Sequence, residues 1–242
     1  MTGRAVRPER GSATREMILN TAERLFAERG MHAVSNRQVS EAAGQSNNAV
    51  VSYHFGTKAD LVRAIARRHA DQMERIRVTL VAEAAGSADL RDWVACLVRP
   101  STEHLTALGS PTWYARFRAQ VVNDPALRRV TVEESLRSAS LRLLLVGLNP
   151  CLPDLPADIR AVRWAMARHL ITQMCVERER ALAEGTPTHE PSWDALATSL
   201  IDAIVGLWQA PVTPVPPGGT TTGELGCHAA GGALEQGQRP PH

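Results

Sequence analysis

The chain has 242 residues, of which 44% are apolar, and its 27 Lys and Arg against 25 Asp and Glu give a net charge of +2. This size and composition predict a globular protein of one or two domains. A membrane protein is disfavoured, because the longest apolar run is Leu143 to Leu148, far short of the roughly 18 residues that span a bilayer. The N-terminus has no apolar segment of a secretory signal, so we expect a cytoplasmic protein.

The first predicted element is a helix from Ala13 to Arg29. Its apolar residues recur at helical spacing: Ile18, Ala22, Leu25 and Phe26. Gly30 is expected to end this helix. Residues 1–12, before it, hold three arginines in a segment that also contains Pro and Gly. They are interpreted either as an arm that lies along DNA phosphates or in a minor groove, or as a disordered tail.

Two short helices follow. Ser35 and Gln38 form a capping box that predicts a helix from Asn36 to Ala43, and Gly44 is expected to stop it in the left-handed conformation. A second helix is predicted over roughly 47–53. Two short helices joined by a glycine-containing turn are typical of the helix-turn-helix unit, whose second helix enters the major groove.

A long helix is predicted next. Thr57 and Asp60 form a second capping box, after which apolar residues at helical spacing continue towards Ala85. This helix would link the N-terminal unit to the remainder of the chain.

The order and spacing of these signals resemble the tetracycline-repressor (TetR) family of ligand-controlled transcriptional regulators. The resemblance is carried by Ala22, Leu25, Phe26, Gly30, Ser35, Arg37, Val39, Ala43, Gly44, His54, Phe55 and Lys58. It implies an all-α fold, with a helix-turn-helix DNA-binding domain at 13–60 and a helical ligand-binding and dimerisation domain at 61–208. It also implies a repressor that binds a palindromic operator as a homodimer and is released by a small-molecule ligand.

The chain departs from the family's pattern at two places. Phe55 follows Gly44 by eleven residues, one more than is usual in the family, and we place the extra residue within 45–48. Ser52 stands where many members carry a phosphate-contacting tyrosine, and Tyr53 is next to it. The base contacts implied by the family are therefore defined only to within one position.

The polar residues around the second short helix divide by what they can bind. Amide side chains can bond adenine edges bidentately, so the base-reading candidates are Gln45, Asn47 and Asn48. The same residue types also cap helices and form turns, and this alternative stays open. Phosphate contacts are expected from Arg37, Ser46, Ser52, Tyr53, His54 and Lys58. Residues 1–78 carry 13 Lys and Arg against 8 Asp and Glu, so the basic excess coincides with this region. Phe55 is expected in the core.

Beyond Ala85 the pattern remains helical. Breaks at Gly, Pro or Ser predict helices over 89–108, 111–123, 125–149, 157–184 and 192–208. From Gln209 the chain becomes rich in Pro, Gly and Thr, which predicts a disordered tail over 209–242.

In the family, the last two long helices pair with their mates in a second subunit. The apolar residues that we expect at this dimer interface are Leu170, Met174, Leu196, Leu200, Ile204, Leu207 and Trp208. The same stripes could instead fill the core of a single chain.

A ligand pocket is expected among the helices between residues 58 and 184, where aromatic and polar side chains occur together. The candidates are Trp93, His104, Trp113, Arg116, Phe117, Trp164 and His169, each of which can alternatively pack the core or lie on the surface. Bound ligand would favour a separation of the two DNA-binding domains that no longer spans adjacent grooves.

Two other classes of function stay open. A nonspecific or architectural DNA-binding protein would bind any duplex alike. An enzyme is disfavoured, because no phosphate-binding glycine loop, G-x-S-x-G or H-E-x-x-H motif occurs. No metal, zinc site or other cofactor is expected, since Cys96, Cys151, Cys175 and Cys227 form no C-x-x-C pair. Buried thiols are expected, with redox sensing through Cys175 as the alternative.

Overall fold

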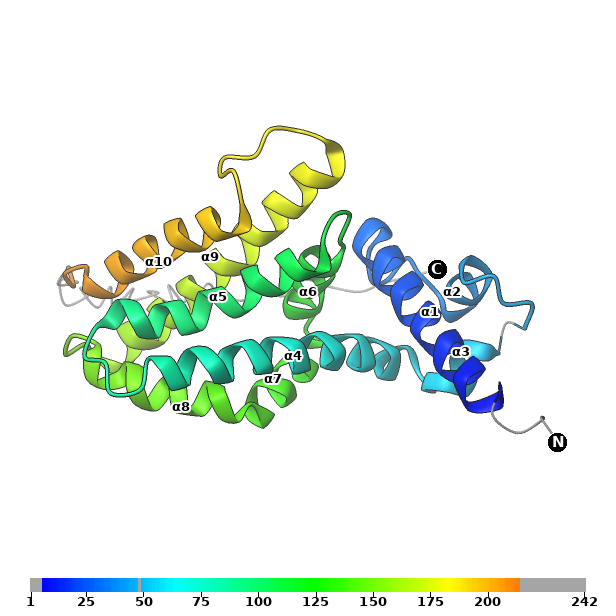
Figure 1. Ribbon diagram of the computed structural model, residues 1–242, viewed down its shortest axis with the longest axis horizontal. Helices are drawn as coiled ribbons and strands as arrows, with labels where there is room; N and C mark the ends of the chain where they lie inside the picture. Colours follow the sequence, from blue (N-terminus) through cyan, green and yellow to red (C-terminus); the bar gives the residue numbers. More distant parts are fainter. Residues whose placement is uncertain (1–5, 48, 214–242) are drawn as a thin grey trace, which may run out of the picture. The chain divides into compact units, whose positions relative to one another are not determined.

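The computed structural model describes residues 6–47 and 49–213, and within these ranges every regular segment is a helix, as predicted (Figure 1). The base-reading candidate Asn48, Cys227 and most of the expected tail at 209–242 lie outside the described residues, as do residues 1–5 of the expected arm. None of the described helices is long and apolar enough to cross a membrane. One compact unit extends to Pro211.

The N-terminal helices are α1 (Val6–Arg29), α2 (Asn36–Ala42) and α3 (Val50–Phe55), which we call the head. Both predicted capping boxes are present. The Ser35 side chain accepts the Gln38 amide N–H while the Gln38 side chain accepts that of Ser35, and Thr57 and Asp60 do the same. Gly44 has φ of +66°, the left-handed conformation expected at the end of α2.

Two boundaries in the head differ from the prediction. Helix α1 begins at Val6 rather than Ala13. Pro8 is compatible with this start, because a residue in the first turn has no helical acceptor for its N–H. Helix α3 begins at Val50 rather than Asn47. The Asn47 side-chain oxygen accepts the Ala49 N–H, and its carbonyl accepts that of Val50, so Asn47 closes a turn instead of starting the helix.

The other helices, which we call the body, begin with the long α4 (Lys58–Glu83). They continue with α5 (Leu90–Leu108), α6 (Tyr114–Asn123), α7 (Arg128–Arg137), α8 (Ala139–Leu148), the 3-10 helix η1 (Asn149–Cys151), α9 (Ala157–Glu184) and α10 (Trp193–Gln209). Helix α10 lies along α5, and α4 packs on the other side of α5 (Figure 1).

Helix α10 packs on α5, and this packing decides what the apolar residues of α10 contact. Leu196, Leu200, Ile204 and Trp208 are at most 2% exposed within a single chain. These four side chains therefore fill the body's own core, the alternative left open above, and have no surface left for a second subunit. Leu170, Met174 and Leu207 are only partly buried.

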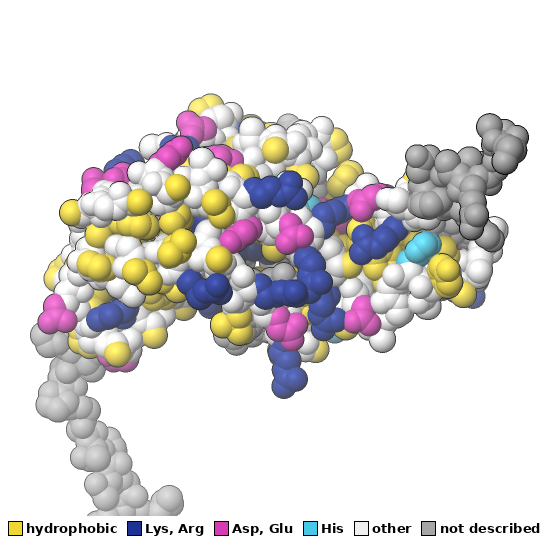
Figure 2. All heavy atoms as spheres, turned by 60° about the horizontal axis from the view of Figure 1, so that its bottom comes forward, with side chains coloured by type: hydrophobic (Ala, Val, Ile, Leu, Met, Phe, Trp, Pro, Cys, Tyr) yellow, Lys and Arg dark blue, Asp and Glu magenta, His cyan; other side chains and the backbone are white. Residues whose placement is uncertain are grey.

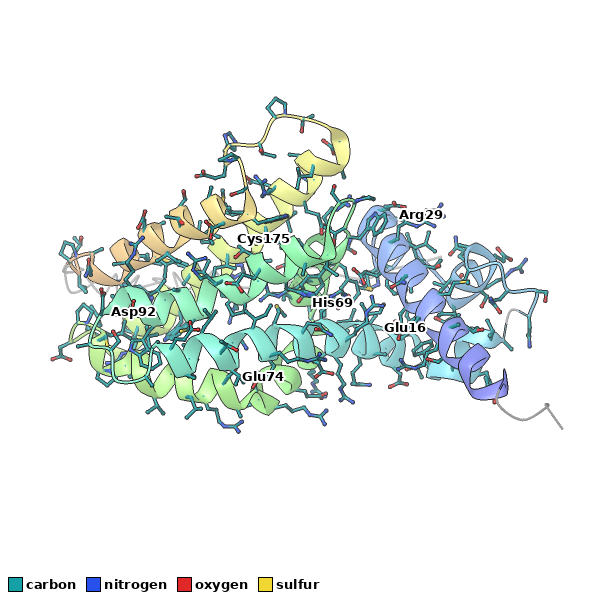
Figure 3. All side chains as sticks on the ribbon, viewed as in Figure 1. Glu16, Arg29, His69, Glu74, Asp92 and Cys175 are labelled. Carbon is teal, nitrogen blue, oxygen red and sulfur yellow. The ribbon has the colours of Figure 1, made fainter. Side chains whose placement is uncertain are left out.

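The predicted helix over 125–149 is split into α7 and α8 at Ser138. The Ser138 hydroxyl caps α8 by accepting the Leu141 N–H. Glu74 of α4, beside the start of α8 in Figure 3, accepts hydrogen bonds from the Ser138 hydroxyl at 2.5 Å and from the Ser140 N–H at 2.9 Å. A carboxylate from a distant helix thus stabilises the break, which helical periodicity alone does not reveal.

Helix α6 holds the end of α1 through the Gln120 side chain. Its oxygen accepts the Met31 N–H at 2.7 Å, and its nitrogen donates to the Phe26 carbonyl at 2.7 Å. The Phe26 ring stacks on Phe117 with a centroid distance of 6.3 Å. One amide side chain therefore bonds two backbone groups at the end of α1.

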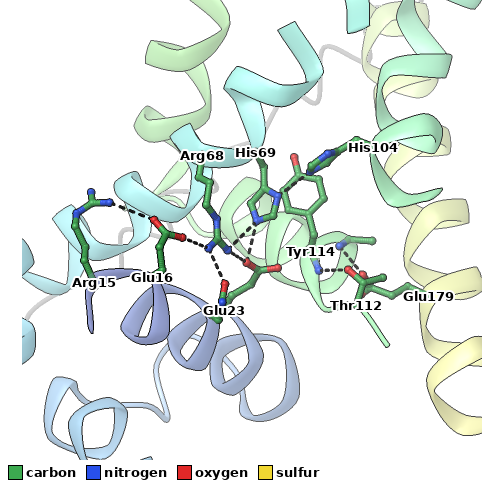
Figure 4. A network of polar contacts seen from close by, with 11 residues as sticks. Arg15, Glu16, Glu23, Arg68, His69, His104, Thr112, Tyr114 and Glu179 are labelled. Carbon is green, nitrogen blue, oxygen red and sulfur yellow. Dashed lines mark hydrogen bonds and ion pairs between the residues drawn. The ribbon is translucent and has the colours of Figure 1, made fainter. Parts of the chain in front are cut away.

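Helix α4 holds α1 through a buried acid. Glu23 is 5% exposed, and its carboxylate accepts from Arg68 at 2.5 Å and lies 2.8 Å from His69 Nε2 (Figure 4). His69 Nδ1 in turn lies 2.7 Å from His104 Nε2 on α5, and the Tyr114 ring stacks on His69. A continuous chain of polar contacts thus joins α1 to α4 and α5.

Gly147 of α8 is expected to tolerate no side chain. A Cβ built there would lie 2.1 Å from the Trp93 ring, so Gly147→Ala must displace a buried indole. We expect a loss of about 1–3 kcal/mol in the free energy of unfolding, measured by denaturant titration. Gly11→Ala in α1 is the control, because its Cβ meets nothing within 4 Å. That variant should be as stable as the wild type or slightly more so. Equal stability of both variants would contradict this packing.

His104 should make stability depend on pH. Burial, reinforced by the neighbouring His69, lowers the pKa of His104 from 6.5 to about 4. Between these values the unfolded chain binds a proton that the folded chain does not, so stability falls as pH decreases through this window.

His104→Gln removes this titration. The decrease in melting temperature between about pH 7 and about pH 5 should therefore be smaller in His104→Gln than in the wild type. His169→Gln, at an exposed position, serves as the control and should keep the wild-type slope. An unchanged slope in His104→Gln would assign the pH dependence to other groups.

Candidate nucleic-acid interface

Helix α3 has one buried and one exposed face. Val51 is fully buried against the head, whereas Ser52 is exposed and Tyr53 is 83% exposed. An exposed tyrosine of this degree makes no contribution to the core and presents a large ring and a hydroxyl to solvent. The face that carries Ser52 and Tyr53 is therefore the solvent-exposed face of α3.

Two of the base-reading candidates, Gln45 and Asn47, lie in the turn before α3, not on the helix. Gln45 donates from its side chain to the Ala43 carbonyl at 3.1 Å, and Asn47 closes the turn described above. Both side chains therefore satisfy local backbone groups. Helix α3 ends at Phe55, next to Gly56 with φ of +78°.

The phosphate candidates fall into two groups. Arg37, Ser46, Ser52 and Tyr53 are exposed, and Arg37 pairs with Glu41 one turn along α2. Lys58 instead points into the head, where its ammonium donates to the Met31 carbonyl and lies 5.6 Å from the Phe26 ring centroid. Burial lowers the pKa of Lys58, and the nearby charge of Asp124 opposes that change. In this arrangement Lys58 helps to hold the head together.

His54 and Phe55 are both partly buried. Their rings contact one another, and the Arg15 guanidinium lies 4.9 Å from the centre of the Phe55 ring. Phe55 packs against the core as predicted but is not fully enclosed.

The structure does not bring the ligand-pocket candidates together. Trp93, His104 and Phe117 are buried in different contacts, and His169 is exposed. Trp164 packs edge-on against Trp208, and Trp113 donates to Glu28 of α1 at 3.2 Å. Arg116 lines an open cleft of about 660 Å³ formed by the end of α1, α6 and α9, but its guanidinium already pairs with Glu179 at 2.9 Å.

The sequence reasoning missed the buried polar residues that join the head to the body, above all Glu23 and Gln120. Glu23 directly follows Ala22 in the apolar stripe of α1. A charged residue at the edge of such a stripe is the sequence feature that could have identified it as buried. Gln120 carried no signal, because its partners Phe26 and Met31 are about ninety residues away.

The described cysteines are reduced and largely enclosed. Burial raises the pKa of Cys175 to about 12 and that of Cys96 to about 11, so both thiols stay protonated and unreactive at neutral pH. This environment argues against redox sensing through Cys175. The described part of the chain also holds no cluster of three His, Cys, Asp or Glu residues that could bind a metal ion.

Comparison with known proteins gives matches that begin in the head. Residues 18–65 match the model of bacterial regulatory proteins of the tetR family. The transcriptional repressor AcnR of Corynebacterium glutamicum is 40% identical over 63 residues, which is 26% of this chain and 33% of AcnR. AcnR of Corynebacterium diphtheriae is 32% identical over 89 residues, 35% of this chain and 46% of the relative. The chain thus spans a third to a half of the curated relatives that it matches.

Solved structures match over most of the chain. The multidrug binding protein EbrR in complex with imidazole has a TM-score of 0.50 at 22% identity, covering 82% of this chain and 97% of EbrR. NalD, the secondary repressor of the MexAB-OprM multidrug efflux pump of Pseudomonas aeruginosa, has a TM-score of 0.52 at 20% identity, covering 81% and 96%. These likenesses concern the fold. The N-terminal helix-turn-helix of this chain is a domain of the TetR family of bacterial regulatory proteins.

Proposed function

We propose that this protein is a transcriptional repressor that binds a palindromic operator as a homodimer and leaves it when a small molecule binds the body. The observation that carries the proposal is the capped α2–α3 unit, in which α3 buries Val51 and exposes Ser52 and Tyr53, within a segment that matches the family's DNA-binding domain. A helix held by its buried face and free on the other can enter a major groove.

The positions of these residues indicate which of them would contact DNA and which would hold α3 in place. Tyr53, Ser52, Ser46 and Arg37 are exposed and suited to phosphate contacts. Gln45 and Asn47 would reach base edges only by giving up their local backbone hydrogen bonds, so these two contribute less than exposed α3 residues if the head stays rigid. His54 and Lys58 would hold α3 in position through contacts within the head rather than through contacts with DNA.

Tyr53→Ala should reduce operator affinity by about tenfold or more, since a good phosphate or base contact is worth about 1–3 kcal/mol. The melting temperature should hardly change, because the side chain is 83% exposed. The operator is first obtained by iterative selection from random duplexes, and affinity is then measured at fixed salt. Val146→Ala, exposed on α8, is the control and should bind normally. Normal binding by Tyr53→Ala would remove α3 from the interface.

The same selection separates the proposal from the alternative, an architectural DNA-binding protein. A repressor should enrich one palindromic sequence and prefer it to a scrambled duplex by about a thousandfold or more. Similar affinity for every duplex, falling steeply with salt, would support the alternative.

The dimer would form through the exposed side of α9. Val162, Met166, Leu170 and Met174 recur every fourth residue, which aligns them on one face of the helix. Val162 and Met166 are each about half exposed in the single chain, and Leu170 and Met174 keep part of their surface. An apolar stripe of this kind is favoured as an interface, because burying it removes apolar area from water.

Met166→Glu should therefore halve the molar mass measured by light scattering and weaken operator binding, because a buried unpaired charge opposes association. Leu143→Glu places the same charge on an exposed position of α8 and should leave the mass unchanged. A wild-type protein that is monomeric with and without operator DNA would overturn the dimer, and dissociation by Leu143→Glu alone would move the interface to α8.

A further inference from the structure

The interior of the body around Met73 contains hydrogen-bond donors that lack good acceptors. The Arg77 side chain is 13% exposed, and its Nε is buried without a partner. The hydroxyls of Ser101 and Tyr114 both point to the Met73 sulfur, at 3.8 and 3.7 Å, and a thioether is a weak acceptor. The two hydroxyls come from α5 and α6 and converge on Met73 of α4, and Arg77 follows Met73 by one turn of the same helix.

A second arginine, Arg118 of α6, adds to these donors without a good acceptor. It forms no hydrogen bond or ion pair with any residue in the part of the chain that the structure describes. Arg118 follows Tyr114 by four residues, so the two side chains lie on the same face of α6. The positive charge of Arg118 also acts on Arg77 and Cys175. Burial lowers the pKa of Arg77, and the positive charge of Arg118 adds to this lowering while Glu74 opposes it.

The acids nearby are already engaged. Glu74 lies 3.4 Å from Arg77 Nη1, but it also accepts from Ser138 and twice from Ser140, so it compensates Arg77 only partly. Glu179 accepts from the backbone of Ala115 and from the backbone and side chain of Arg116. Two cations thus share one carboxylate, and one positive charge has no acidic partner within residues 6–47 and 49–213.

We propose that Arg77 and Arg118 bind the carboxylate of a monoanionic organic ligand, with the Tyr114 hydroxyl as a third donor and the ligand's apolar part against Cys96 and Cys175. This inference rests on the proposed function, for which it names the ligand class. A carboxylate supplies the acceptors that the buried donors lack, and its single charge matches the uncompensated one. The same two arginines would repel a cationic ligand.

Entry of the ligand requires Met73 to move. Its unbranched side chain changes conformation at low cost, and its sulfur is the weak acceptor that the carboxylate would replace. On the face turned forward in Figure 2, Lys and Arg side chains gather near the middle, and such a surface attracts anions.

The proposed site adjoins the polar contacts between α4 and α1 that join the body to the head. The Tyr114 ring stacks on His69 with a centroid distance of 4.0 Å, and His69 contacts Glu23 of α1 (Figure 4). A carboxylate that engages the Tyr114 hydroxyl would therefore act on the ring that supports this link. Ligand binding and head position would be coupled through these packed groups.

The experiment measures binding of sodium acetate, benzoate and octanoate to the full chain by calorimetry, beside the neutral amides of the same acids. We expect binding that strengthens from acetate to the larger acids and is at least about tenfold weaker for each amide. Arg118→Gln should weaken carboxylate binding by about tenfold or more. Its melting temperature without ligand should match or exceed that of the wild type, because it loses no internal partner. Arg75→Gln, exposed on the same helix as Arg77, should bind normally.

Failure of every carboxylate to bind would overturn the proposal, as would amides that bind as tightly as the acids or an Arg118→Gln variant with unchanged affinity. Binding by calorimetry is measured without DNA, so it does not depend on the proposed repressor function. A protein that selects an operator but binds no carboxylate would refute only this inference. A protein that binds carboxylates but selects no operator would refute only the proposed function.

Discussion

The buried carboxylate of Glu23 determines how the head attaches to the body. An acid 5% exposed is tolerated only when its charge is paired, and here Arg68 and His69 of α4 supply the partners. Removing one partner from such a buried pair typically costs about 3–5 kcal/mol, so α1 is held firmly to α4. Because α1 also packs against α2, the orientation of the whole helix-turn-helix is set by this contact.

Helix α6 forms the second attachment and the element best placed to transmit a change. Its start is held by Glu179 of α9, which accepts the Ala115 and Arg116 N–H groups, and its side chain at Gln120 bonds the end of α1. A shift of α6 therefore moves both a body contact and a head contact. Since Tyr114 and Arg118 lie on the same helix, the proposed ligand site and this attachment share one rigid element.

The functional surfaces proposed for DNA and for the second subunit have different physical origins. The exposed face of α3 carries polar side chains and one exposed aromatic ring, Tyr53, a composition suited to a charged partner. The stripe on α9, from Val162 to Met174, is apolar and suited to another apolar surface. A dimer formed through α9 would place two heads on one duplex, so that each weak contact of a six-residue α3 acts twice.

The sequence by itself determined the features whose partners lie within one turn of the chain. The capping boxes at Ser35 and Thr57, the left-handed Gly44 and the helical class of the body all depend on local geometry. Only the tertiary structure decided which faces are covered. Periodicity shows that Leu200 and Ile204 share a face of α10, but not that α5 rather than a second subunit covers it. The surplus charge of Arg77 and Arg118 likewise depends on which acids the fold brings near, because burial and pairing join residues far apart in the chain.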